Sequence, residues 1–420
     1  MIDEVQILIF SSLTIIYAVW IIILLIPKKN KIVRESYPKI SIILPTYNEG
    51  NVIEDSIKSL LDAEYPNDRE IIVANDGSTD NTRAVVENLM KKFTEIKLLN
   101  LQHGGKSNAL NTAIKSSLYD ILVILDADSL VEKNSLKEIV KPLNETDVGG
   151  VTGIIRARIN KNPLTWFQDF EYILSSGWRY ICTKIDANSI LPGFAAFKKE
   201  ALLKINGFST ETLTEDFDIV LALREVGYKT KTIPSAMIFT TVPQTIGNLL
   251  RQRLRWARGT IQVIRKYKKF IISKDSGFMG LFTIPSQFYW YVHATIYLPT
   301  MLYMMISGYY KYFLVKNDIL SLAVFKYFFS WMSFYGMIEM VYRVITGYYA
   351  LTFIMLLTII ASLLSILYTL LVIFKLSRPK IHDFIVYFFF FPYSLFNLSI
   401  LSASLIYELT KPKTFNIWEK

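Results

Sequence analysis

Four long segments contain no Asp, Glu, Lys or Arg, and they constrain the fold more than any other feature of the sequence. They cover residues 5–26, 276–310, 344–374 and 384–407. Because about 20 apolar residues in a helix cross the hydrocarbon core of a bilayer, each segment predicts a transmembrane helix. The chain of 420 residues is 52% hydrophobic and has a single cysteine, which excludes a disordered protein, a collagen-like fibre and a disulfide scaffold.

A fifth segment, residues 319–340, is a weaker span because Lys326 and Glu339 interrupt it. Counting it gives five crossings. Acidic residues precede the first span and basic residues follow it, which places the N-terminus outside and the next segment in the cytoplasm. Basic residues between 375 and 380 then fall in an external loop, so either the positive-inside bias is broken or one segment is interfacial. The prediction is a multi-pass integral protein of the plasma membrane, whose cations beside the spans explain the net charge of +10.

Residues 38–240 read differently, because short apolar runs alternate there with amphipathic stretches. This is the pattern of a doubly wound α/β domain. Strands are predicted at residues 40–44, 70–74, 96–99, 121–125 and 150–153, and helices at 51–61, 80–92 and 106–117. Crossovers of this length favour parallel neighbouring strands.

Acidic loops follow three of the predicted strands: PTYNE at residues 45–49, NDGSTD at 75–80 and DADS at 126–129. Open α/β sheets bind ligands beyond the carboxyl ends of their strands, so these loops should share one crevice. The spacing of Asp126 and Asp128 suits Mg²⁺ or Mn²⁺, with substrate phosphates completing the coordination shell. The alternative is that each loop only ends a strand and caps a helix, which explains one loop better than three in register.

TEDFD at residues 214–218 precedes an apolar-periodic helix start, where Thr214 or Asp216 could act simply as an N-cap. QRLRW at residues 252–256 lies in a strongly basic helical stretch. Offsets of three and four put the first, fourth and fifth residues of this motif on one helix face. The remaining cations, Arg251, Arg253 and Arg258, are better explained by anionic lipid headgroups.

These five motifs, in this order, resemble those of family 2 inverting glycosyltransferases with the GT-A fold. More closely, they resemble the membrane-embedded branch that contains poly-N-acetylglucosamine, hyaluronan, chitin and cellulose synthases. The resemblance covers about residues 38–260, and the membrane organisation beyond is similar. It implies an α/β GT-A catalytic domain with a doubly wound, mixed sheet, joined to an α-helical transmembrane bundle.

The resemblance implies roles for residues of a nucleotide-sugar donor site. These are Thr46, Tyr47 and Glu49 beside the nucleoside, Asp76 at the uracil base, Lys106 near the nucleotide, and Asp126 at the ribose or metal. Asp128 would ligate the Mg²⁺ or Mn²⁺ ion that bridges the diphosphate. For Lys106 the alternative is a solvated lysine at a helix start.

The resemblance also implies that Asp216 is the general base. An inverting transfer needs a carboxylate on the face of the sugar opposite the departing nucleotide, where it takes the proton of the acceptor hydroxyl. The residues implied at the diphosphate and the acceptor are Gln252, Arg255, Trp256, Gly193, Phe194 and Glu215. A planar guanidinium fits phosphate oxygens bidentately, and an indole ring offers a flat surface to a sugar.

Two aromatic segments complete the organisation of the chain. Residues 164–184 predict a helix at the membrane surface, or else a buried helix of the α/β domain. Trp418 in the C-terminal tail is either part of a segment that gates the nucleotide site or an interfacial anchor. We divide the chain into a first transmembrane helix with a basic linker, a cytoplasmic GT-A domain, an interfacial helix with the QRLRW motif, a C-terminal transmembrane region and a tail, at residues 1–37, 38–240, 241–275, 276–410 and 411–420.

The implied function is inverting, metal-dependent transfer of a sugar from a UDP-sugar to a growing polysaccharide, coupled to translocation through the membrane. The partners are the UDP-sugar, a glycan acceptor and membrane lipids. One alternative is single-step transfer to a membrane lipid acceptor, and another is a transporter with a degenerate nucleotide-binding domain. The motifs of zinc sites, P-loops and nucleic-acid-binding proteins are absent from the sequence, so no nucleic-acid partner is expected. Sequence spacing does not identify the sugar.

Overall fold

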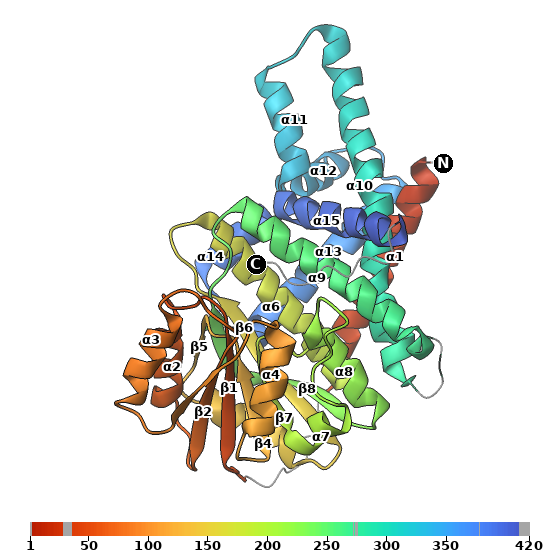
Figure 1. Cartoon of the computed structure of the whole chain (residues 1–420). Coiled ribbons are helices and arrows are strands. Elements are labelled where there is room, and N and C mark those ends of the chain that lie inside the picture. The colour runs from red at the N-terminus through yellow and green to blue at the C-terminus, as the bar shows by residue number, and fades with distance from the viewer. Residues whose placement is uncertain (1, 28–35, 272, 274–275, 378, 411–420) are drawn as a thin grey trace.

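The computed structural model describes residues 2–27, 36–271, 273, 276–377 and 379–410, and Figure 1 follows the chain through them. An α/β domain lies at one end, and long helices from both ends of the sequence extend away from it (Figure 1). The predicted basic linker residues 28–35 and the C-terminal segment with Trp418 lie outside the described residues.

One mixed sheet organises the α/β domain, with the strand order β3-β2-β1-β4-β7-β6-β8-β5 in the described part of the chain. The strands are β1 Ile40–Thr46, β2 Arg69–Asn75, β3 Ile96–Asn100, β4 Ile121–Leu125, β5 Ser129–Val131, β6 Val148–Ala157, β7 Phe194–Lys198 and β8 Lys229–Thr240. The first four are parallel, as predicted. β7 then runs antiparallel to both β4 and β6, which makes the sheet mixed. The sequence did not predict β5, β7 or β8.

Helices cover both faces of the sheet because successive side chains of each strand point to opposite faces. On β1, Ile42 and Leu44 pack with the helices of one face, whereas Ile43 packs with those of the other. The first face carries α2 Ile53–Asp62, α3 Thr82–Met90 and α5 Ser135–Val140. The second carries α4 Lys106–Ser116, α7 Lys199–Lys204 and α8 Glu215–Glu225. The domain therefore buries its strands on both sides and leaves their carboxyl ends for a site.

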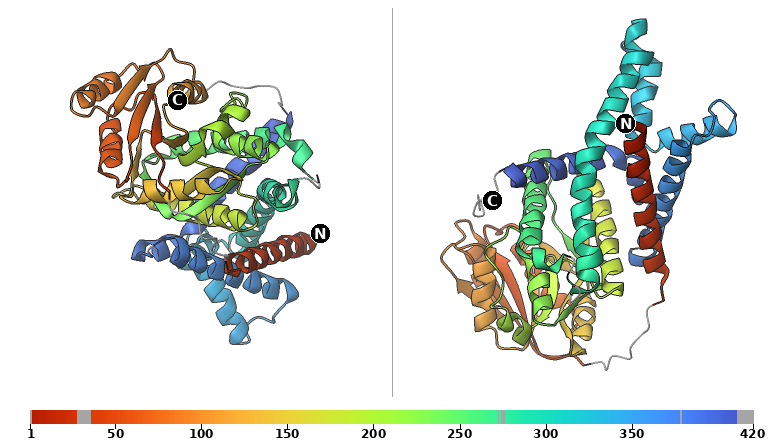
Figure 2. Two further views of the ribbon diagram at one scale, coloured as in Figure 1. Left: turned by 90° about the horizontal axis from the view of Figure 1, so that it is seen from below. Right: turned by 90° about the vertical axis from the view of Figure 1, so that its right-hand side faces the viewer.

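Three described helices combine the length and the apolar composition that membrane crossing requires. They are α1 Ile2–Leu25, α13 Phe353–Leu376 and α15 Phe390–Thr410. α10 Ile284–Tyr312 is longer but less apolar. α1, α10 and α13 run along one direction, whereas α15 lies across them in two perpendicular views (Figures 1 and 2).

The span predicted at residues 319–340 is wrong as a single helix. This stretch contains two helices of 11 residues, α11 Leu322–Met332 and α12 Tyr335–Ile345, separated by an extended backbone at Ser333. Neither helix has the roughly 20 residues that a crossing needs. Arg343 does pair with Glu339 at 2.7 Å, four residues earlier on α12.

The aromatic helix at 164–184 forms α6 Pro163–Lys184. Its residues Phe170 and Ile173 belong to the same buried cluster as Ile154 of the sheet and Val372 of α13. α6 is therefore buried between the α/β domain and the apolar helices, rather than lying on the membrane surface with one face open.

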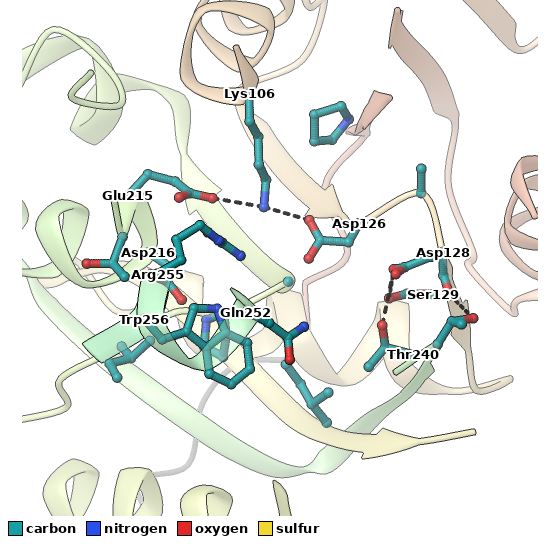
Figure 3. Close-up of a pocket in the computed structure, with 18 of the residues that line it drawn as sticks. Lys106, Asp126, Asp128, Ser129, Glu215, Asp216, Thr240, Gln252, Arg255 and Trp256 are labelled. Atoms are coloured by element: carbon teal, nitrogen blue, oxygen red, sulfur yellow. Dashed lines mark hydrogen bonds and ion pairs between the residues drawn. The ribbon is translucent and has the colours of Figure 1, made fainter. Parts of the chain in front are cut away.

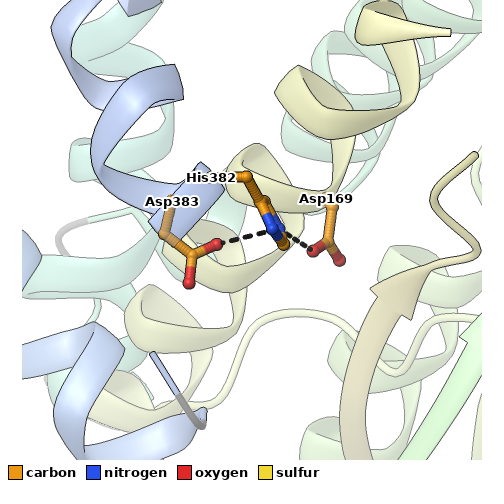
Figure 4. A group of neighbouring side chains, drawn as sticks. All are labelled: Asp169, His382 and Asp383. Carbon is orange, nitrogen blue, oxygen red and sulfur yellow. Dashed lines mark ion pairs between the residues drawn. The ribbon is translucent and has the colours of Figure 1, made fainter. Parts of the chain in front are cut away.

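An ion-pair cluster joins α6 to the sheet and to α14 Ile381–Phe388 (Figure 4). Asp169 of α6 accepts two hydrogen bonds from the Arg156 guanidinium of β6, at 2.8 and 2.6 Å, and a third from the backbone N–H of Ala157. His382 of α14 lies between Asp169, at 3.9 Å, and Asp383, at 3.3 Å. Since Arg156 neutralises Asp169, the cluster serves as a polar connection between three elements.

Substitution Arg156→Met should destabilise the protein strongly, because it leaves the carboxylate of Asp169, which is 2% exposed, without its cation. We expect a loss of about 3–5 kcal/mol in the free energy of unfolding. The measurement is unfolding of the detergent-solubilised protein. Arg83→Met is the matched control, because its ion pair with Glu87 is exposed and worth about 0.5 kcal/mol or less. Equal effects of the two substitutions would contradict this account.

Candidate active site

A cavity of about 470 Å³ opens at the carboxyl ends of β1, β2 and β4. One side is formed by the loops after these strands, which are the three acidic loops of the sequence. The opposite side is formed by α6 and by α9 Ile246–Lys266. Figure 3 shows Lys106, Asp128, Asp216 and Trp256 among the side chains around it. The loops therefore converge on one crevice, and helices that adjoin the apolar bundle close it.

Lys106 connects two of the acidic motifs. Its ammonium lies 2.8 Å from Asp126 after β4 and 2.9 Å from Glu215 at the start of α8 (Figure 3). Burial opposes the charged form of Lys106, but the two carboxylates outweigh it and raise its pKa. Burial also acts to raise the pKa of Glu215, but Lys106 and Arg255 hold this pKa below its ordinary value. The alternative of a solvated lysine is wrong.

Asp76 is fixed by the loop that carries Lys106. Its two carboxylate oxygens accept hydrogen bonds from the backbone N–H groups of Gly104 and Gly105, at 2.8 and 2.9 Å. His103 in the same loop stacks on Tyr47, with ring centroids 4.4 Å apart. Asp76, Tyr47 and His103 all line the cavity, so a flat aromatic surface lies beside this carboxylate.

Asp126 and Asp128 line the cavity together with Glu49. Asp128 accepts a hydrogen bond from the Thr240 hydroxyl at 3.1 Å. Burial, together with the carboxylates of Asp126 and Glu49, raises the pKa of Asp128 to about 6. Hard carboxylate oxygens gathered in this way fit Mg²⁺ or Mn²⁺, which prefer oxygen ligands and usually share them with substrate phosphates.

Asp216 enters the cavity from the first turn of α8. Burial, together with the charge of Glu215, raises its pKa to about 6. Thr214, the residue at the N-cap position, makes no side-chain capping hydrogen bond. A carboxylate in this environment changes protonation close to neutral pH, which is the range where a general base works best.

α9 presents Gln252, Arg255 and Trp256 to the cavity, as the offsets in the motif predict. Arg253 points elsewhere, but its assignment to lipid headgroups is wrong. Its guanidinium is buried, pairs with Glu171 of α6 at 2.5 Å and lies 4.3 Å from the centre of the Trp256 ring. Arg253 therefore holds the cavity-facing indole in place.

Arg258 also departs from the lipid prediction. It pairs at 2.9 Å with Glu408 of α15, and Gln262 donates a hydrogen bond to the same carboxylate at 3.3 Å. Glu408 is buried. These contacts connect the cavity helix α9 to the apolar helix α15. Arg251 is exposed and remains compatible with a lipid contact.

The two residues predicted in the loop before β7 differ in position. Gly193 lines the cavity, and a Cβ atom there would lie 2.7 Å from a carboxylate oxygen of Asp126, so glycine allows this close approach. Phe194 is fully buried in the hydrophobic core and borders only a small adjoining hollow. The structure therefore brings Gly193 to the cavity but not Phe194. Gly193 lies in the loop before β7, whereas Phe194 is the first residue of that strand and packs into the core.

Polar and aromatic residues that line the cavity but were not predicted from the sequence include His103, Tyr172, Arg179 and Thr240. His103 carried a weak signal, because it begins the HGGKS stretch that contains Lys106. The other three lie in helices or strands whose place beside the acidic loops depends on the tertiary fold. All other predicted site residues, Thr46, Tyr47, Glu49, Asp76, Lys106, Asp126, Asp128, Glu215, Asp216, Gln252, Arg255, Trp256 and Gly193, line the one cavity.

A mixed GT-A sheet with an acidic cavity at its strand ends and apolar helices beside it defines a membrane-associated glycosyltransferase. Residues 41–205 match glycosyl transferase family 2. The chain is 32% identical over 300 residues to a poly-β-1,6-N-acetyl-D-glucosamine synthase of Staphylococcus epidermidis, and the alignment covers 69% of each protein. The chain therefore belongs to glycosyl transferase family 2 and is a glycosyltransferase, as the resemblance predicted.

A further relative and a solved structure agree with this assignment. The poly-β-1,6-N-acetyl-D-glucosamine synthase of Staphylococcus aureus strain MSSA476 is 34% identical over 245 residues, which is 56% of this chain and 58% of the relative. A mannosyltransferase from Pyrobaculum calidifontis, solved with GDP-Man and Mn²⁺, superposes with a TM-score of 0.61 over 89% of this chain and 98% of its own. Its sequence is 21% identical, so this likeness shows the fold.

Substitution Lys106→Met should destabilise the protein more at pH 8 than at pH 5. Burial and the charge of Glu215 already raise the folded-state pKa of Asp216 to about 6, and Lys106 opposes this rise, so loss of the ammonium moves that pKa further above its unfolded value. Such a group stabilises the fold at low pH, and this contribution is lost as the pH rises through the folded-state pKa. We expect the penalty to grow by about 1–3 kcal/mol between the two pH values, measured by unfolding in detergent. Lys106→Arg keeps the charge and is the control. A penalty independent of pH would contradict the prediction.

Proposed function

We propose that this glycosyltransferase transfers a sugar, with inversion, from a UDP-sugar to a growing polysaccharide. The observation that carries the proposal is that Asp126 and Asp128 share one cavity with Asp216, which enters from a different element. The pair Asp126 and Asp128 suits a metal-bound diphosphate, and Asp216 suits the hydroxyl that attacks the sugar. The similarity to poly-β-1,6-N-acetyl-D-glucosamine synthases supports an N-acetylglucosamine donor and a polymeric product.

The donor side of the proposed reaction uses the strand-end loops. The stacked pair of Tyr47 and His103, next to Asp76, offers a surface for the nucleobase. Asp126 and Asp128 would hold a divalent ion, Mg²⁺ or Mn²⁺, which when bound neutralises the diphosphate and helps it to leave. Hard oxygen ligands on a strand end support this role.

The acceptor side uses α8 and α9. An acceptor hydroxyl oxygen forms the new bond to the anomeric carbon while the bond from that carbon to the diphosphate oxygen breaks. Asp216 takes the hydroxyl proton, and the nucleoside diphosphate departs with the bonding electron pair. Gln252 and Arg255 bind the departing diphosphate, and Trp256 supports the terminal acceptor sugar.

The membrane arrangement is also a proposal. We infer that the catalytic domain faces the cytoplasm of a plasma-membrane protein, because nucleotide sugars are supplied there and the first apolar helix is followed by basic residues. α15 lies across the other apolar helices and against α9, which favours an interfacial position for it (Figure 2). Because residues 319–340 form two short helices and no single span, α13 would end on the cytoplasmic side and leave Lys375 and Lys380 there.

The size of the product tests the proposal. Purified protein in lipid nanodiscs is incubated with Mn²⁺ and, in turn, UDP-N-acetylglucosamine, UDP-glucose, UDP-glucuronate or GDP-mannose, and nucleotide release and product length are measured. We expect release with UDP-N-acetylglucosamine and a product of many sugars. A product that stays one sugar long and partitions with lipid would favour the alternative of single-step transfer to a lipid. Asp128→Asn and Asp216→Asn should each abolish transfer, whereas Asp147→Asn, at an exposed ion pair with Lys229, should not.

The pH dependence of transfer should report Asp216. Its base form is needed for proton removal, and its pKa is about 6 because of burial and the neighbouring charge of Glu215. We therefore expect the rate to rise with pH up to about 6 and then to level off. Glu215→Gln removes a like charge and should move the acid limb to lower pH, whatever it does to the maximal rate. An acid limb that stays in place in this variant would argue against Asp216 as the titrating group.

A further inference from the structure

Arg179 of α6 is a buried cation that the reaction described above does not use. The side chain lines the cavity, and the residue is only 4% exposed. Its guanidinium donates hydrogen bonds to the hydroxyls of Ser175, at 2.9 Å, and Ser176, at 2.8 Å. Nε has no hydrogen-bond partner, and no described carboxylate lies within ion-pair distance. Two neutral hydroxyls therefore satisfy only part of a group that has five N–H donors.

Such an arrangement costs stability, because a buried charge without a counter-ion loses its hydration. Burial lowers the pKa of Arg179 to about 10, and the opposing attraction comes from Asp216. The other charged guanidinium of α6 and α9 at comparable depth, Arg253, has a carboxylate partner at 2.5 Å. Unsatisfied hydrogen-bond donors in the wall of a cavity are expected where a ligand supplies the missing acceptors.

The surroundings of Arg179 separate it from the donor side. Lys106 forms ion pairs with Asp126 and Glu215. Arg179 instead lies on the α6 side of the cavity with Tyr172 and Ser175. The carboxylate whose charge acts to raise its pKa is Asp216. These three α6 residues are spaced three and four apart, so they share one helix face toward the cavity. This face of α6 lines the same cavity as Asp216, the proposed base.

We propose that Arg179 is an acceptor-binding residue, whose guanidinium donates hydrogen bonds to oxygen atoms of the terminal acceptor sugar and orients the attacking hydroxyl toward Asp216. The inference rests on the proposed function and names a residue for its acceptor side. A planar fork suits two neighbouring sugar oxygens at once, and an ammonium does not reproduce it. In this proposal the oxygen-rich end of the acceptor glycan binds to Arg179 of α6 as well as to Trp256 of α9.

The test separates acceptor use from donor use. Donor binding, hydrolysis of the donor by water, and transfer to a short N-acetylglucosamine oligosaccharide are measured for the wild type and for Arg179→Gln. We expect kcat/KM for the acceptor oligosaccharide to fall by about 10- to 100-fold in Arg179→Gln. The affinity for the donor and the rate of donor hydrolysis should stay within about twofold of the wild type. Arg179→Lys keeps the charge, lacks the fork and should raise the acceptor KM. Arg224→Gln, which removes a guanidinium outside the cavity, is the control.

Each result has a definite meaning. Unchanged transfer in both Arg179 variants overturns the inference, and so does a loss of donor affinity, which would assign the residue to the diphosphate. A parallel fall of hydrolysis and transfer would indicate a structural role and would also overturn it. Should Arg179→Gln fail to fold, the acceptor KM of Arg179→Lys decides. A wild-type protein that turns over no donor contradicts the proposed function itself, which is a different failure.

Discussion

The contact of Lys106 with Asp126 and Glu215 is the interaction on which the rest of the site depends. Several carboxylates enter one largely buried cavity, and like charges at such spacing repel each other strongly when water is scarce. The ammonium offsets part of that repulsion and joins the sheet to α8. The remaining repulsion affects the two neighbouring carboxylates differently, because the pKa of Asp216 rises to about 6 while that of Glu215 is held low. One carboxylate is thus prepared to accept a proton and its neighbour to stay charged.

The cavity is also connected to the membrane helices through charge. Arg253 pairs with Glu171, and Tyr393 of α15 donates a hydrogen bond to the same carboxylate at 2.5 Å. Arg258 pairs with Glu408, also of α15. These buried contacts fix α9 between the acidic loops and an apolar helix. The position of this apolar helix is therefore tied to the side chains that line the cavity.

Sequence patterns predicted the parallel half of the sheet and most of the cavity because both depend on local signals. Apolar runs of five residues identify buried strands, and the acidic turns directly follow them. The strands β7 and β8 were missed because their partners are distant in the chain: β7 runs antiparallel to β4, and β8 runs parallel to β6. Arg253 and Arg258 were assigned to lipid because helix periodicity shows which face a residue occupies and not which element covers that face. The single span predicted at residues 319–340 was wrong because apolar content does not show whether a helix is interrupted.

The sequence by itself determined the class of protein. Its uncharged segments require a membrane or a deeply buried bundle, and its ordered acidic motifs require a shared crevice at strand ends, because both consequences follow from hydration and from strand geometry. Only the tertiary structure decided that α6 forms the second wall of that crevice and brings Arg179 into the same cavity as Asp216. This placement results from packing between segments far apart in the chain, and such packing is set by the summed burial of many side chains rather than by any local pattern.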